Sequence, residues 1–117
     1  MFDLARSGAC EALTAQVTAG VPVNLTNDKG DTLLILAAYH NHPATVAALL
    51  SSGADPDRVN DRGQTALAAA VFRQNAETVT ALLAAGADPD GGSPSAAATA
   101  DYFKLPQMAA LLRGGTA

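Results

Sequence analysis

The sequence predicts an all-α stack of repeated helix–turn–helix units that are joined by exposed β-turn or hairpin loops. The segment Gly-Ala-Asp-Pro-Asp at 53–57 recurs at 86–90, and the same offset relates 27–32 to 60–65. A fixed period of roughly 20–50 residues indicates stacked repeats. Hydrophobic residues make up 49% of the chain and aromatic residues only 4%, which suits a core of small aliphatic side chains between closely packed helices.

The first complete unit shows the signals that begin and end two helices. Thr32 is the expected N-cap of a helix that runs to about His40, because its hydroxyl can accept a hydrogen bond from the first turn. Asn41 follows, and Asn tolerates the left-handed conformation that ends helices. Pro43 suits the first turn of a second helix, and Gly53 ends that helix.

The second complete unit repeats these signals. Thr65 is expected to cap a helix that runs to about Arg73. A second helix follows, in which Val79 and the pair at 82–83 fall on one inward face, since their spacing is i, i+3 and i+4. Gly86 ends this helix.

The two ends of the chain are expected to be capping units, so the domain divides into 1–26, 27–59, 60–90 and 91–117. Terminal repeats are usually atypical. The pair Leu111 and Leu112 follows the pair at 82–83 at an interval shorter than the repeat period, which predicts that the last loop has lost about four residues.

In that last unit Ser93 is the expected N-cap and Pro94 the first helical residue. The helix is then expected to continue over 96–103, and Pro106 to begin the final helix.

At this point the residues resemble the ankyrin repeat family, and the overall pattern is similar to small stand-alone bacterial ankyrin repeat proteins. The family's Asp-x-x-Gly turn is matched by Asn-Asp-Lys-Gly at 27–30 and Asn-Asp-Arg-Gly at 60–63. Its closing motif is matched by Gly-Ala-Asp-Pro-Asp, and the resemblance covers essentially the whole chain. The family's His, which ties neighbouring loops by hydrogen bonds, is replaced by Ile35 and Ala68, which predicts that those bonds are not made in the usual way.

Charge and composition exclude several classes of function. The net charge is −4 and the pI is about 4.8, whereas nucleic-acid binding needs clustered Lys and Arg. A neutral or basic partner surface, or simply a solvated acidic surface, fits this balance better. The start of the chain has no basic and apolar signal pattern, and no apolar run approaches the length of a membrane span. We therefore expect a cytoplasmic protein that binds neither nucleic acid nor membrane.

Catalytic, cofactor and metal sites are not indicated. Cys10 is the only cysteine, so neither an internal disulfide nor a thiolate zinc site can form. His40 and His42 are the only histidines, and their spacing puts them on different sides of a helix end. We expect His40 to be exposed and His42 to pack or hydrogen-bond near the inter-helix turn, and we expect no enzymatic activity.

The resemblance implies that the concave face, formed by loop tips and first helices, binds another protein. Tyr39 and Phe72 are the most informative pair, because they occupy equivalent positions that the fold does not require to be aromatic, and stacking should place them side by side. The alternative is that Phe72 folds back over the neighbouring helix and Tyr39 is merely solvated. In the last unit, either Asp101 or Tyr102 occupies the position equivalent to Tyr39 and Phe72, because the alignment of that unit is ambiguous by one residue. The complete candidate set is Arg6, Asp28, Lys29, Asp31, Tyr39, His40, Asp61, Arg62, Gln64, Phe72, Arg73, Asp101 and Tyr102.

Binding of a protein partner by a monomer is the favoured function. Three alternatives remain open, namely a self-assembling scaffold, an immunity or antitoxin protein, and a regulator associated with a stress-response enzyme. A mass measurement in solution separates the scaffold from the others.

Overall fold

The computed structural model describes residues 2–113, which form eight α-helices and no strand. None of these helices is long and apolar enough to cross a bilayer. The helices are α1 (Phe2–Ser7), α2 (Cys10–Thr18), α3 (Leu33–Tyr39), α4 (Pro43–Ser51), α5 (Ala66–Phe72), α6 (Ala76–Ala84), α7 (Ala96–Tyr102) and α8 (Pro106–Leu112).

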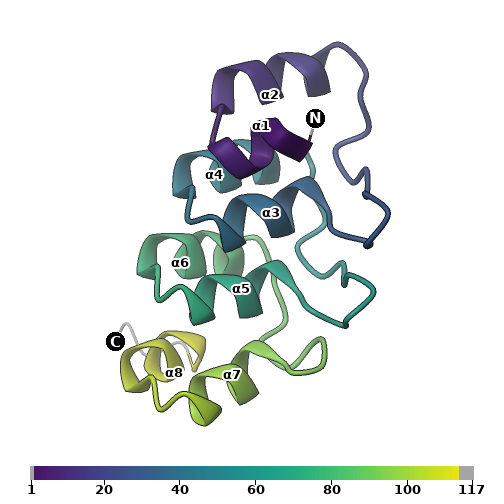
Figure 1. Cartoon of the computed structure of the whole chain (residues 1–117). Helices are drawn as coiled ribbons and strands as arrows, with labels where there is room; N and C mark the ends of the chain where they lie inside the picture. The colour runs from purple at the N-terminus through teal and green to yellow at the C-terminus, as the bar shows by residue number, and fades with distance from the viewer. Residues whose placement is uncertain (1, 114–117) are drawn as a thin grey trace.

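The helices are arranged in two layers (Figure 1). The odd-numbered helices contact one another in the order α1, α3, α5, α7, and the even-numbered helices follow in the order α2, α4, α6, α8. Each odd helix also contacts the even helix that follows it in the chain. The loops project to one side of both layers (Figure 1), and the molecule measures 40 × 29 × 21 Å.

The predicted caps begin the first helices of the complete units. The Thr32 hydroxyl accepts a hydrogen bond from the amide of Ile35 at 3.0 Å, and Thr65 accepts one from Ala68 at 3.1 Å. Such a cap contributes about 1 kcal/mol. Each cap therefore defines the residue at which its seven-residue helix, α3 or α5, begins.

A left-handed residue ends the first helix of each complete unit, as predicted for Asn41, whose φ is 68°. Gln74 and Lys104 have φ values of 57° and 54° at the equivalent turns. Gly8 supplies the same conformation in the first unit, with φ of 73°. The reversed direction after these residues brings the second helix of each unit against the first.

The start of the last unit differs from the prediction. Ser95, not Ser93, is the N-cap of α7, and its hydroxyl accepts a hydrogen bond from Ala98 N at 3.0 Å. The helix ends at Tyr102, one residue earlier than predicted.

The N-caps also correct the length of the last loop. Ser95 follows Thr65 at an interval three positions shorter than the one from Thr32 to Thr65. Lys104 follows Gln74 at the same shortened interval. Three residues are therefore missing from this unit, not four.

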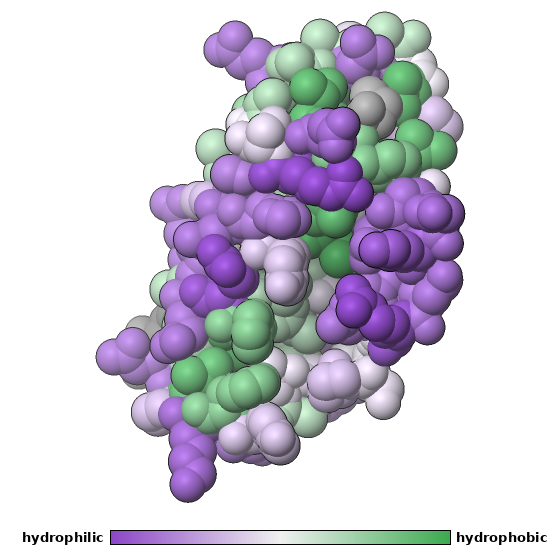
Figure 2. All heavy atoms as spheres, in the orientation of Figure 1, coloured by the Kyte–Doolittle hydropathy of each residue, from purple (hydrophilic) through white to green (hydrophobic). Residues whose placement is uncertain are grey.

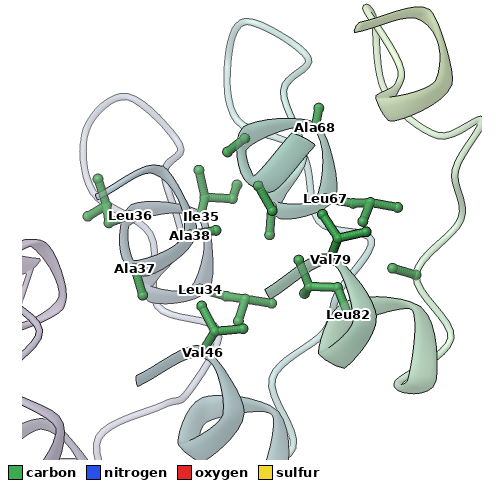
Figure 3. Packing of buried hydrophobic residues seen from close by; sticks show 14 of the residues in the cluster. Leu34, Ile35, Leu36, Ala37, Ala38, Val46, Leu67, Ala68, Val79 and Leu82 are labelled. Atoms are coloured by element: carbon green, nitrogen blue, oxygen red, sulfur yellow. The ribbon is translucent and has the colours of Figure 1, made fainter. Parts of the chain in front are cut away.

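The core lies between the two helix layers and between neighbouring units. Leu34, Leu67, Val46, Val79 and Leu82 are all almost fully buried, and Figure 3 shows their side chains directed into the space between the helices. Burying each such side chain contributes roughly 1.5–3 kcal/mol. The inward face predicted from the spacing of Val79 and the pair at 82–83 is therefore confirmed at Val79 and Leu82, whereas Leu83 is half-buried.

Neighbouring loops are tied together by hydrogen bonds that backbone amides donate. Asp61 N donates to the Lys29 carbonyl at 3.0 Å, and Asp88 N donates to Asp57 Oδ1 at 2.8 Å. An antiparallel β-bridge between Thr26 and Thr32 closes the loop that precedes α3. These bonds fix the loops relative to the helices, and thereby fix the surface that the two create together.

Candidate functional site

A groove of about 460 Å³ lies between the odd-numbered helices and the loops. Figure 2 shows hydrophobic surface in a hollow between helices and loops, and a second hydrophobic patch over α5 and α7. Eight of the thirteen predicted residues line the groove, and five do not. Those that line it are Arg6, Lys29, Asp31, Tyr39, His40, Arg62, Gln64 and Phe72; those that do not are Asp28, Asp61, Arg73, Asp101 and Tyr102.

Exposed aromatic rings occupy one end of the groove. Tyr39 and Phe72, each the last residue of its helix, are 47% and 46% exposed. Phe103, which the sequence analysis did not single out, is 49% exposed and meets Phe72 edge to face at 5.4 Å between ring centroids. The Tyr39 ring instead meets that of His40 at 5.2 Å, so each of the two rings has its own aromatic neighbour while both line the groove.

The corrected alignment explains the position of Phe103. With the shortened interval, Tyr102 is the equivalent of Phe72, and Phe103 follows Arg73 and His40 in the next column. Tyr102 is 80% exposed and meets the Phe103 ring at 4.9 Å. The aromatic surface therefore extends into the last unit through Phe103, which lines the groove where Tyr102 does not.

Asp31 is an exception to the predicted surface character of the candidate residues. Its side chain is buried, with 8% exposure, and its Oδ1 accepts a hydrogen bond from Asn60 Nδ2 at 2.8 Å. Asn60 comes from the next unit along the chain. Asp31 thus connects two units at the base of the groove and is not an exposed charge.

Basic side chains form much of the polar wall. Arg6, Lys29 and Arg62 line the groove and are exposed. Burial lowers the pKa of His40 below its ordinary value, and the nearby charges of His42, Arg6 and Arg73 lower it further. Each of these effects disfavours an added positive charge, so His40 is mainly neutral at pH 7.

Comparison with known proteins identifies the repeat. A family model described as ankyrin repeats in three copies matches residues 1–91. The chain belongs to the ankyrin repeat family. It is also similar to an ankyrin repeat protein of Pseudomonas aeruginosa, with 52% identity over 46 residues. This match covers 39% of the chain and 27% of that relative's length.

The ankyrin His positions have a different role in this chain. Ile35 and Ala68 replace that His, and both line the groove. In Figure 3 the Ala68 side chain points away from Val79 and Leu82, out of the layer between the helices. Ile35 and Ala68 therefore contribute apolar surface to the groove, and the loop hydrogen bonds described above link the units.

Several groove residues were not predicted as site residues. Besides Phe103, they are Ile35, Leu36, Ala68, Ala69, Pro94 and Thr99. The departure from the ankyrin pattern at Ile35 and Ala68 is a signal that could have identified two of them. Pro94 and Thr99 required the corrected alignment of the last unit.

The two histidines lie as expected. His40 is exposed at the end of α3, whereas His42 is half-buried and its Nε2 lies 2.7 Å from the Arg6 carbonyl oxygen. Over residues 2–113 no group of three or more His, Cys, Asp or Glu side chains is arranged to hold a metal ion.

Proposed function

We propose that this chain binds a protein partner in the groove on its concave face. Ankyrin repeats are in general protein–protein interaction modules. The observation that carries the proposal is the row of half-exposed rings, Tyr39, Phe72 and Phe103, beside the groove. Aromatic and Arg side chains dominate the binding energy of protein interfaces.

These rings add little to the fold as it stands. Tyr39 and Phe72 end their helices, where each leaves nearly half of its surface exposed to water. The core at the equivalent depth of α3 and α5 is made by other, fully buried residues such as Leu34 and Leu67. A partner that covered the rings would gain the apolar burial that folding alone leaves unused.

The double variant Tyr39→Ala/Phe72→Ala tests the proposal. A tagged wild-type chain captures its partner from the source cells, and the captured protein is identified by mass spectrometry and purified. We expect the double variant to bind that protein at least tenfold more weakly in calorimetric titrations, since each interface aromatic contributes on the order of 1–2 kcal/mol. Thermal unfolding should change little, because the two ring contacts that are lost, Tyr39–His40 and Phe72–Phe103, involve half-exposed side chains outside the core.

A matched control replaces two exposed residues of the even-numbered helices, Thr80→Ala/Gln107→Ala. This variant should bind like the wild type. The proposal fails if the aromatic double variant unfolds far more easily while its folded fraction binds normally, because Tyr39 and Phe72 would then belong to the core.

A further inference from the structure

The groove has the opposite charge to the molecule as a whole. The chain carries 11 acidic and 7 basic residues, yet Arg6, Lys29 and Arg62 line the groove. Arg73 lies close enough to His40 to lower the pKa of that imidazole. The acidic residue in the lining, Asp31, is buried and hydrogen-bonded to Asn60.

Three carboxylates of the repeat-closing loops, those of Asp55, Asp57 and Asp88, accept hydrogen bonds from backbone amides of these loops. Asp57 N donates to Asp55 Oδ1 at 2.9 Å, and Asp90 N donates to Asp88 Oδ1 at 2.9 Å. Asp57 in turn accepts a hydrogen bond from the amide of Asp88. None of these carboxylates lines the groove, so the excess negative charge lies elsewhere on the surface.

Three of the basic side chains around the groove have no carboxylate partner among the described residues. Within the described range of 2–113, the ion pairs join Arg6 to Asp3 and Arg58 to Asp55, and none involves Lys29, Arg62 or Arg73. The Arg6 pair is itself exposed, and exposed pairs of this kind exchange readily with other partners. A guanidinium presents a fixed fork of donors that matches a carboxylate.

The shape of the groove favours a short segment with an apolar side chain. Its lining includes the aliphatic residues Ile35, Leu36 and Ala68 as well as basic side chains and the rings of Phe72 and Phe103. A volume of about 460 Å³ accommodates a few side chains but not a folded domain. The groove therefore combines an apolar surface with the basic side chains of Arg6, Lys29 and Arg62.

We propose that the groove binds a short acidic segment of a partner protein, with carboxylates on Arg6, Lys29 and Arg62 and an apolar side chain against Phe72 and Phe103. This inference rests on the proposed function and specifies the chemistry of the partner. It reverses the neutral or basic partner that the net charge of the chain suggests.

A peptide suits this surface better than a nucleic acid. Asp28 and Asp61 are exposed next to Lys29 and Arg62 at the two loop tips. A phosphate backbone carries charge at every step and would meet these carboxylates. A peptide can place its acidic side chains on the cations and neutral ones opposite Asp28 and Asp61.

The test is a selection of twelve-residue random peptides displayed on phage against the immobilised wild-type chain. We expect the selected peptides to be enriched in Asp and Glu around one aromatic or leucine residue. The best of them is synthesised with a fluorescent label, and its affinity is measured by fluorescence polarisation. The variant Lys29→Glu/Arg62→Glu should bind it at least tenfold more weakly, because like charges now face each other.

A charge-matched control separates the groove from the rest of the surface. Arg58→Glu/Arg113→Glu changes the net charge by the same amount at exposed residues outside the groove, and its affinity should stay within twofold of wild type. Circular dichroism confirms that both variants are folded. Equal weakening in both would overturn the proposal, since net charge alone would then explain the effect.

The remaining outcomes distinguish this inference from the proposed function. If neutral or basic peptides are selected and Tyr39→Ala/Phe72→Ala abolishes their binding, the acidic segment is wrong while binding in the groove stands. If the selected peptides bind all variants equally, both proposals are wrong. If a single-stranded oligonucleotide binds more tightly than the selected peptide, the inference that the partner is a peptide segment is wrong. A selection that yields no binder also overturns the inference.

Discussion

Asn60 joins two neighbouring units through a single side chain. Its Nδ2 donates to Asp31 Oδ1 at 2.8 Å and to Gln64 Oε1 at 2.9 Å, while its Oδ1 accepts from the amides of Arg62 and Gln64. We predict that Asn60→Ala lowers the free energy of unfolding by about 1–3 kcal/mol, because buried polar groups lose their partners. Urea denaturation measures this change.

The matched control for this prediction is Asp31→Asn, which keeps an Oδ1 acceptor for Asn60 Nδ2. It should lower the free energy of unfolding by less than about 1 kcal/mol, since the hydrogen bond is retained. A loss as large as that of Asn60→Ala would show that the charge of Asp31, and not its bond to Asn60, stabilises this contact.

The lowered pKa of His40 predicts the direction in which the free energy of unfolding changes with pH. Its pKa in the folded chain lies below the ordinary 6.5, chiefly through burial and then through His42, Arg6 and Arg73. The unfolded chain therefore binds the proton more readily, so stability falls as pH drops below about 6.5 and levels off below the lowered pKa. We predict that urea midpoints between pH 7.5 and 5.5 fall less in His40→Gln than in wild type. Parallel curves for the two proteins would contradict this, and the effect is small because the ring is exposed.

Residue exposure could be predicted only where it depends on local sequence. Tyr39 and Phe72 end helices whose limits the caps define, and both are exposed. Asp31 occupies a loop position that the sequence presents as polar surface, but the side chain of Asn60, from the next unit, covers it. That contact depends on how two units stack, which residue types do not reveal.

Helix limits followed from the sequence wherever a single residue could form the cap. Thr32 and Thr65 are confirmed as caps, and Pro43 and Pro106 begin α4 and α8 as predicted. In the last unit, two serines flank Pro94 and both have the chemistry of an N-cap. The path of the shortened loop decides between them, and this path brings Phe103 into the groove.

The turn between α1 and α2 packs tightly against the turn that precedes α4. A Cβ atom added to Gly8 would lie 2.5 Å from His42 Nδ1, and the other ring nitrogen of His42 is held 2.7 Å from the Arg6 carbonyl oxygen. We predict that Gly8→Ala lowers the free energy of unfolding by about 2–4 kcal/mol, since left-handed strain of roughly 1–2 kcal/mol adds to overpacking. Urea denaturation measures the loss.

A double-mutant cycle with His42→Ala separates the two causes. Without the imidazole, Gly8→Ala should cost only the strain, roughly 1–2 kcal/mol, so the two changes are not additive. The same loss in both backgrounds would show that the conformation of Gly8, and not its contact with His42, is what the glycine provides.

At the scale of the whole molecule, the repeat period was sufficient to predict a stack of helix–turn–helix units joined by exposed loops. It was not sufficient to predict the character of the groove. The lining combines residues from four units, and its charge is opposite in sign to the chain's net charge of −4. The net charge sums over the whole chain, so it does not reveal that basic residues gather at the groove while most acidic residues lie elsewhere.

That separation of charge has a consequence for how a partner arrives. Exposed charges act mainly within the Debye length of about 8 Å at physiological salt. Within that distance, the proposed acidic segment would be repelled by exposed loop carboxylates such as those of Asp55, Asp57 and Asp88. At the groove itself the segment would meet Lys29 and Arg62, whereas Asp28 and Asp61 lie outside the lining. If the proposed acidic segment binds in the groove, the loop carboxylates would disfavour other directions of approach, so that the orientation of the partner would be selected before contact.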